Sequence, residues 1–249
     1  MELSSVSNEF GMVELILAVG ILFLAYLVRG ITGFGSALVA VPFLLFILPF
    51  KIVIPWIVAL DYMASASHGI KHRKAISWHD ILPLLPFTLV GVLSAIYVFR
   101  TVDVQLLLKI LGGLIVGYAV YSLFPFHMQH RHSRLWAIPA ASLGGLIGTL
   151  FATGGPFYVI YLKLRGLDKA AFRSSIAAIL LLDGGMRLTG FLLSGFYTVK
   201  ILLMFVLSLP VMWLALYIGG HIHLRISQPA FQKIISITLI CSGVGLMLK

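Results

Sequence analysis

The chain alternates long apolar stretches with short polar connections, and ten apolar segments can be distinguished along its 249 residues. Five of them are long enough, or nearly so, for the roughly 20 residues that a helix needs to cross a bilayer. The second, sixth and seventh are shorter, as half-helices or re-entrant pieces would be. The pattern predicts an all-α polytopic membrane protein with about 8–10 transmembrane helices. The segments cover residues 12–29, 36–50, 52–70, 80–99, 104–124, 135–150, 154–164, 172–194, 199–220 and 229–248.

Glycine clusters interrupt two of these apolar stretches, one in each half of the chain. The first cluster contains Gly33 and Gly35, and the second runs from Gly144 to Gly155 and is followed by Pro156. Glycine and proline release backbone N–H and C=O groups from the helix ladder. In lipid such groups are costly unless buried protein or a polar cavity satisfies them. Two broken segments in corresponding places of two halves are typical of a transporter's binding site.

The composition excludes an ordinary soluble domain. Charged residues make up 10% of the chain, against about 25% in soluble proteins. The net charge of +10 does not indicate a nucleic-acid partner, because most basic residues lie in short connections between apolar runs. The chain has one cysteine, Cys241, and no phosphate-binding loop. We therefore expect no metal site, no cofactor and no hydrolysis of ATP.

The basic residues also predict the topology. If every segment crosses the membrane and the N-terminus lies outside, eleven basic residues fall on one face and four on the other. The positive-inside rule assigns the richer face to the cytoplasm. Arg29, Arg134 and Arg165 are among the eleven. Arg187 belongs to neither group, because it lies deep in an apolar segment.

Similar residues recur in the two halves about 120 positions apart. Gly35 corresponds to Gly154 and Asp61 to Asp183. Because each half holds five segments, an odd number, the second half must enter the membrane in the opposite orientation. We therefore expect two inverted-topology repeats, an architecture common among secondary transporters. The expected boundaries are 1–125 for the first transmembrane repeat, 126–134 for a basic, His-rich linker and 135–249 for the second repeat.

At these glycine stretches the chain resembles the sulfite exporter TauE/SafE family, also called the toluene sulfonate uptake permease family. The family is very apolar, carries a duplicated domain and has a glycine-rich stretch in each copy, often followed by a proline. The resemblance covers essentially the whole chain. It implies transport of sulfur-containing or other small organic anions across the cytoplasmic membrane. The matching residues are Gly30, Gly33, Gly35 and Pro42 in the first copy, and Gly144, Gly148, Gly154, Gly155 and Pro156 in the second.

Three polar residues inside apolar segments are candidates for coupling or gating. Asp61 and Asp183 occupy matching repeat positions, and a carboxylate near the bilayer centre costs at least ~2.5–3.5 kcal/mol unless it is paired, protonated or in a wet cavity. The two aspartates therefore either bind a coupling proton or cation or hold helices together structurally. His68 follows Asp61 on the same helix face and can take up a proton near neutral pH. The alternative for His68 is a hydrogen-bonded histidine near a helix end.

The candidate anion pocket combines Arg187 with the two glycine breaks. Arg187 follows Asp183 by four residues, so the two side chains share a helix face. Its guanidinium either neutralises Asp183 or binds an anionic substrate, because its planar donor fork fits two oxygens at once. Free N–H groups at a half-helix N-terminus also suit an anion. Alternatively, the glycines only allow close helix packing. The remaining pocket candidates are Gly33, Gly35, Ser36, Thr153, Gly154 and Gly155.

Together these features predict a secondary active transporter rather than an enzyme, in the bacterial cytoplasmic (inner) membrane as a multi-pass protein. It would move a small anion, a sulfonate, sulfite or related organosulfur compound, by alternating access. Protons are favoured over sodium as the coupling ion, while the direction of transport and a homo-oligomeric state are left open. The main alternative is an anion channel of the same architecture. A third alternative is a membrane enzyme or assembly factor that uses Asp61, His68 and Asp183. Against it, the sequence has no recognisable catalytic motif.

Overall fold

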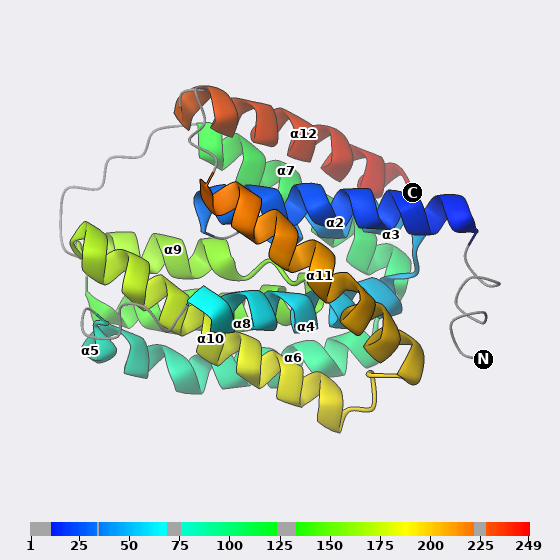
Figure 1. Cartoon of the computed structure of the whole chain (residues 1–249). Coiled ribbons are helices and arrows are strands. Elements are labelled where there is room, and N and C mark those ends of the chain that lie inside the picture. Colours follow the sequence, from blue (N-terminus) through cyan, green and yellow to red (C-terminus); the bar gives the residue numbers. More distant parts are fainter. Residues whose placement is uncertain (1–10, 34, 69–75, 124–132, 222–227) are drawn as a thin grey trace. The chain divides into compact units, whose positions relative to one another are not determined.

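The computed structural model describes residues 11–33, 35–68, 76–123, 133–221 and 228–249, and every secondary-structure element in these ranges is a helix (Figure 1). A helix lies in each of the ten expected segments, which confirms the all-helical prediction. The helices are α2 (Met12–Thr32), α3 (Ser36–Ile47), α4 (Phe50–His68), α5 (Trp78–Ile81), η2 (Leu82–Leu84), α6 (Leu85–Thr101), α7 (Val104–Leu123), η3 (Arg134–Trp136), α8 (Ala137–Phe151), α9 (Gly155–Leu164), α10 (Lys169–Leu193), α11 (Val199–His221) and α12 (Gln228–Leu248).

Six helical stretches in the described part of the chain are long and apolar enough to cross a membrane. One of them, Arg134–Phe151, reaches 18 residues because the short helix η3 precedes α8. The expectation that the sixth segment is short is therefore wrong. The second and seventh segments remain short, as expected, with 12 residues in α3 and 10 in α9.

Both glycine clusters mark breaks between helices, as predicted. At the first, α2 ends at Thr32, and Gly33 and Gly35 have φ angles of +87° and +91° before α3 begins at Ser36. This left-handed backbone suits glycine because other residues clash there. At the second, α8 ends at Phe151, and the left-handed residue is Ala152, with φ of 58°. The glycines of the second break thus serve close approach rather than left-handed backbone.

The chain forms two compact units that alternate along the sequence. The first comprises Met1–Val53, Val102–Pro125 and Thr198–Lys249, and the second comprises Ile54–Thr101 and Phe126–Tyr197. In the first unit α2 packs on α11 and α7 packs on α12 (Figure 1). The α2–α11 contact depends on small residues, as helix packing in membranes often does. A Cβ on Gly30 would lie only 2.8 Å from the Leu216 carbonyl oxygen.

In the second unit α6 packs along α8, and α10 lies against both α6 and α9. Gly91 of α6 and Gly145 of α8 let the two backbones approach, because a Cβ on either residue would overlap the other helix. The core of this unit lies between α5, α8, α9 and α10. It is formed by Ile81, Leu84, Ala137, Ala141, Tyr158, Tyr161, Leu162, Ala178 and Ile179. The two-repeat arrangement and its boundaries stay a prediction.

Candidate functional site

The second glycine break, in the second unit, surrounds a buried ion pair on α10. Asp183 and Arg187 are one helical turn apart and only 2% and 6% exposed. The Arg187 Nε donates to Asp183 Oδ1 at 2.9 Å, and Nη2 donates to Oδ2. Nη2 also lies 3.4 Å from the carbonyl oxygen of Gly144 on α8. The guanidinium thus binds the planar Asp183 carboxylate through two parallel hydrogen bonds, which is the strongest geometry for this donor.

Glycines make the room that the Arg187 guanidinium occupies. A Cβ on Gly148 would overlap Nη2 and Cζ of Arg187 and lie 2.7 Å from Nη1. A Cβ on Gly154 would overlap both Nη2 and the carbonyl oxygen of Gly144. Gly144 lies midway along α8, Gly148 lies in its last turn and Gly154 lies directly before α9, so the space for the guanidinium opens beside the helix break. We call Gly144, Gly148 and Gly154 together the glycine cradle.

Two further residues of the second break were predicted as pocket residues. Thr153 is buried at 7% exposure and lies between the left-handed Ala152 and Gly154 of the glycine cradle. Gly155 begins α9, and a Cβ there would make only an ordinary contact with Leu180, at 3.9 Å. The structure therefore brings Arg187 into contact with both Gly154 and Asp183, and Thr153 and Gly155 are the chain neighbours of Gly154.

Sequence analysis missed two hydroxyl groups beside Asp183. Tyr158 of α9 is fully buried, and its hydroxyl lies near the Asp183 carboxylate. The same hydroxyl lies 3.3 Å from Thr88 Oγ1 on α6, and the Thr88 side chain is buried too. A Cβ on Gly144 would lie 2.7 Å from Tyr158 Cζ, so the glycine cradle also seats this ring. In the sequence Tyr158 is one aromatic among many in apolar segments, and no local pattern distinguishes it.

The first glycine break, in the first unit, also carries a buried arginine. Arg29 lies in the last turn of α2 with 6% exposure, and its Nη1 donates to Ser36 Oγ at 3.0 Å. Ser36 is fully buried at the start of α3. The Arg29 carbonyl accepts the Gly33 N–H at 2.6 Å, which closes the helix end, while Gly35 precedes Ser36. The charge count gave no sign that Arg29 is buried, and its place directly before the glycine run was the available signal.

The remaining coupling candidates lie on α4. Asp61 is half-buried, and its backbone carbonyl accepts the Ser65 hydroxyl at 2.8 Å. His68 is the last residue of α4, and its side chain lies outside the described residues. Asp183 is therefore the coupling candidate whose surroundings the structure describes in full detail.

A second buried ion pair in the second unit was not predicted. Asp80 of α5 is 2% exposed, and its Oδ1 accepts from Arg165 Nε at 2.8 Å and Arg134 Nε at 3.4 Å. Ser77 Oγ donates to the other oxygen at 2.8 Å, and the Tyr161 hydroxyl donates to the Asp80 carbonyl. Arg165 is itself 6% exposed, although it lies in the connection that follows α9. We call this group the Asp80 cluster.

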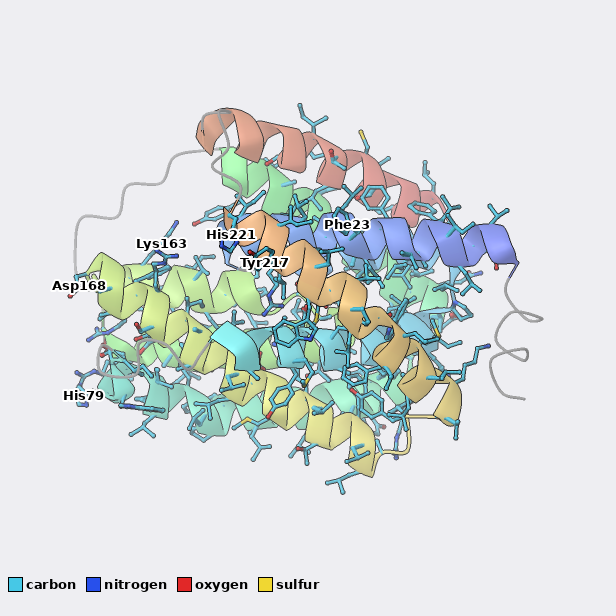
Figure 2. The ribbon with its side chains drawn as sticks, in the orientation of Figure 1. Phe23, His79, Lys163, Asp168, Tyr217 and His221 are labelled. Atoms are coloured by element: carbon cyan, nitrogen blue, oxygen red, sulfur yellow. The ribbon has the colours of Figure 1, made fainter. Side chains whose placement is uncertain are left out.

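The Asp80 cluster lies where α5 begins and α9 ends. The neighbouring polar side chains His79, Lys163 and Asp168 are exposed at this end of the unit (Figure 2). Tyr161 in the last turn of α9 and Arg165 directly after it both bind Asp80. The cluster therefore anchors the C-terminal end of α9, the helix that begins directly after the glycine cradle.

Comparison with known proteins decides the family. The model of the sulfite exporter TauE/SafE family matches residues 17–246, nearly the whole chain. The chain belongs to this family. It is also 24% identical over 195 residues to the "Probable inner membrane transporter protein TsaS" of Comamonas testosteroni, a match that covers 76% of this chain and 80% of that protein. No solved structure matches the chain. As a TauE/SafE protein it is a multi-pass transporter of the cell membrane rather than an enzyme.

Proposed function

We propose that this TauE/SafE protein is a secondary active transporter that binds a small sulfur oxyanion, a sulfonate or sulfite, at Arg187. The observation that carries the proposal is the two-bond contact of Arg187 with Asp183 inside the glycine cradle. A sulfonate group offers two oxygens to one guanidinium edge, as a carboxylate does. It can therefore take the place of Asp183 on Arg187, bond for bond.

Exchange is favoured over simple opening of the ion pair for an energetic reason. Removing one partner of a buried pair typically costs about 3–5 kcal/mol, because a buried charge is left uncompensated. An incoming anion supplies a new partner for Arg187 and leaves only Asp183 without its cation. Since Asp183 is 2% exposed, its charged form is then costly, and taking up a proton removes that cost. Anion binding and proton binding are linked in this way.

The linkage predicts electroneutral transport. One monovalent anion and one proton move together, so no net charge crosses the membrane and a pH gradient drives accumulation. Alternating access of the site to the two sides would complete the cycle. The broken helices support this, because irregular backbone at membrane depth occurs where it lines a cavity or lies buried in protein.

The test uses purified protein in liposomes and radiolabelled methanesulfonate, whose charge is fixed over the working pH range. We expect saturable uptake that follows a pH gradient and does not change when a potassium diffusion potential is imposed. Uptake that follows the potential and runs at channel rates would instead support an anion channel. Absence of uptake and of binding for methanesulfonate and sulfite alike would refute the substrate class.

Two variants assign the roles. Asp183→Asn mimics the protonated carboxyl, so it should still bind methanesulfonate but lose accumulation driven by the pH gradient. The double variant Asp183→Asn/Arg187→Ala leaves no lone buried charge, and it should lose binding while keeping its fold. Equal binding by the two variants would remove Arg187 from the site.

A further inference from the structure

Within the residues that the structure describes, the chain passes between its two units at three points. Two of them, after residue 101 and after residue 197, fall where one helix has ended and the next has not begun. The third, between residues 53 and 54, lies inside α4. Backbone between helices can change its dihedral angles, whereas an intact helix resists bending. Of these three connections, α4 is therefore the one that opposes motion of one unit relative to the other.

A proline lies directly after the crossing point in α4. Pro55 has no N–H to donate to the carbonyl of Lys51, four residues earlier, and its ring clashes with that carbonyl in a straight helix. Sharp bends in helices usually occur at such prolines. The first turn of α4 is closed by the carbonyl of Pro49, which accepts from the N–H groups of Ile52 and Val53 at 3.0 and 3.1 Å. A helix hydrogen bond is thus missing where the chain changes unit.

Beyond this point α4 is held by the second unit. The Tyr197 hydroxyl, from the connection after α10, donates to the Pro55 carbonyl oxygen at 3.1 Å. One turn further on from Val58, the ring of Tyr62 lies against α10, 3.4 Å from where a Cβ on Gly184 would be. The part of α4 that begins at Pro55 is therefore fixed to the second unit, and any bend falls at the proline.

Four aromatic rings of the second unit join the crossing points. Phe99 lies near the end of α6, Phe191 lies near the end of α10, and Phe196 and Tyr197 follow α10. The rings meet edge to face, a favoured geometry, with contacting centroids between 4.9 and 6.5 Å apart. We call these four residues the aromatic cluster. Since Tyr197 also binds the Pro55 carbonyl, the cluster connects the ends of α6 and α10 to the crossing point in α4.

We propose that Pro55 is a hinge, at which α4 bends when the two units move relative to each other. The aromatic cluster keeps the second-unit ends of the three connections fixed, so the bend is confined to the first turns of α4. Hinges in other proteins are likewise a few residues that absorb a change in backbone angles away from the ligand. The inference rests on the proposed function in one respect, namely that transport proceeds by alternating access.

Replacing Pro55 separates motion from binding. Pro55→Ala restores the helix hydrogen bond to the Lys51 carbonyl and stiffens α4. We expect the maximal rate of methanesulfonate uptake into liposomes to fall roughly tenfold. The Kd for methanesulfonate should stay nearly unchanged, because Arg187 and the glycine cradle lie wholly in the second unit.

Two further variants serve as controls for Pro55→Ala. Pro55→Gly also restores the N–H, but glycine leaves the backbone flexible, so this variant should keep the original rate. Pro210→Ala makes the same exchange inside α11, a helix that lies wholly in the first unit. It should leave the rate unchanged, because no crossing point lies in that helix.

A spectroscopic measurement follows the hinge without transport. His79 and His221 are exposed, one on each unit, and each lies at the end of its helical stretch away from the crossing points. Spin labels are attached through His79→Cys and His221→Cys in a Cys241→Ser background, because Cys241 is the one cysteine of the sequence. Double electron–electron resonance should give a broad distribution of label distances in the original protein and in Pro55→Gly. In Pro55→Ala the distribution should narrow.

The outcomes separate the two proposals. If methanesulfonate is taken up and Pro55→Ala works at the original rate, the hinge is refuted while the transporter stands. Equal slowing by Pro55→Ala and Pro55→Gly also refutes it, because the loss would then follow from the missing ring and not from a stiffer helix. The same holds if the distance distribution is unchanged in Pro55→Ala. If no methanesulfonate is taken up but the distribution narrows in Pro55→Ala alone, the proposed function fails and the hinge stands.

Discussion

Adding one methyl group to the glycine cradle should move Arg187 without disturbing the helices. In Gly148→Ala the three atoms nearest to the new Cβ all belong to the Arg187 guanidinium. The side chain can therefore withdraw while the backbone of α8 stays in place. Gly145→Ala, three residues earlier, meets the backbone carbonyl of Thr88 instead, so it should disturb the α6–α8 packing. The two substitutions, one turn apart in α8, thus distinguish an effect on the Arg187 site from an effect on helix packing.

The magnitude follows from two opposing terms. Alanine in place of glycine inside a helix gains about 1 kcal/mol. A guanidinium that withdraws and keeps only one of its two bonds to an anion loses about 1.5–3 kcal/mol, the usual value of a hydrogen bond to a charged group. The ion pair with Asp183 weakens by a similar amount, so the net loss of folding stability should be about 0.5–2 kcal/mol. In the Asp183→Asn background no carboxylate competes for Arg187, so the loss of one bond to the anion is not offset there. At about 1.4 kcal/mol for each factor of ten, adding Gly148→Ala to Asp183→Asn should weaken methanesulfonate binding roughly tenfold to a hundredfold.

The assay measures Kd for methanesulfonate in the Asp183→Asn background and thermal stability of the original protein in detergent, each with Gly148→Ala, Gly145→Ala or Gly117→Ala added. Gly117 lies in α7, and a Cβ there would meet nothing within 4 Å. We expect this control to leave the Kd unchanged and to be at least as stable. An unchanged Kd in Gly148→Ala would refute the reasoning, because it would show that the position of the Arg187 guanidinium does not matter to the anion.

Other substitutions test the neighbouring features. Asp80→Asn should lower the thermal stability strongly, by an amount near the 3–5 kcal/mol typical of a broken buried pair, because Arg165 then keeps a buried charge. Arg134→Ala should cost less than about 1 kcal/mol of stability, since that side chain is 41% exposed and exposed pairs contribute little. Equal losses of stability in Asp80→Asn and Arg134→Ala would mean that the pair of Arg165 with the Asp80 carboxylate contributes nothing. Gly35→Leu should abolish uptake, because φ of +91° strains any branched side chain, and near-normal uptake would place the first break outside the transport path.

The sequence predicted what depends on local spacing. Span length, glycine and proline breaks and the four-residue step from Asp183 to Arg187 are all properties of short stretches, and the structure confirms the helices, the breaks and this contact. It did not predict the Asp80 cluster, because Asp80 and Arg165 are 85 positions apart and nothing local pairs them. A charge count also gives no sign that Arg165, in the connection after α9, is buried against Asp80.

The two helix breaks share a buried arginine that the sequence did not reveal, but the two arginines are held in different ways. Each holds a buried arginine, but Arg29 belongs to the helix that ends at its break, and its own carbonyl accepts the Gly33 N–H. Arg29 therefore supplies both the buried side chain and the carbonyl that closes the end of α2. Arg187 instead reaches its break from a separate helix and occupies space left by glycines. It can change partners by rotating its side chain alone, without unwinding a helix end. Exchange between a carboxylate and a substrate anion needs that freedom, so the second break is the better place for the reversible step and the first for a fixed charge.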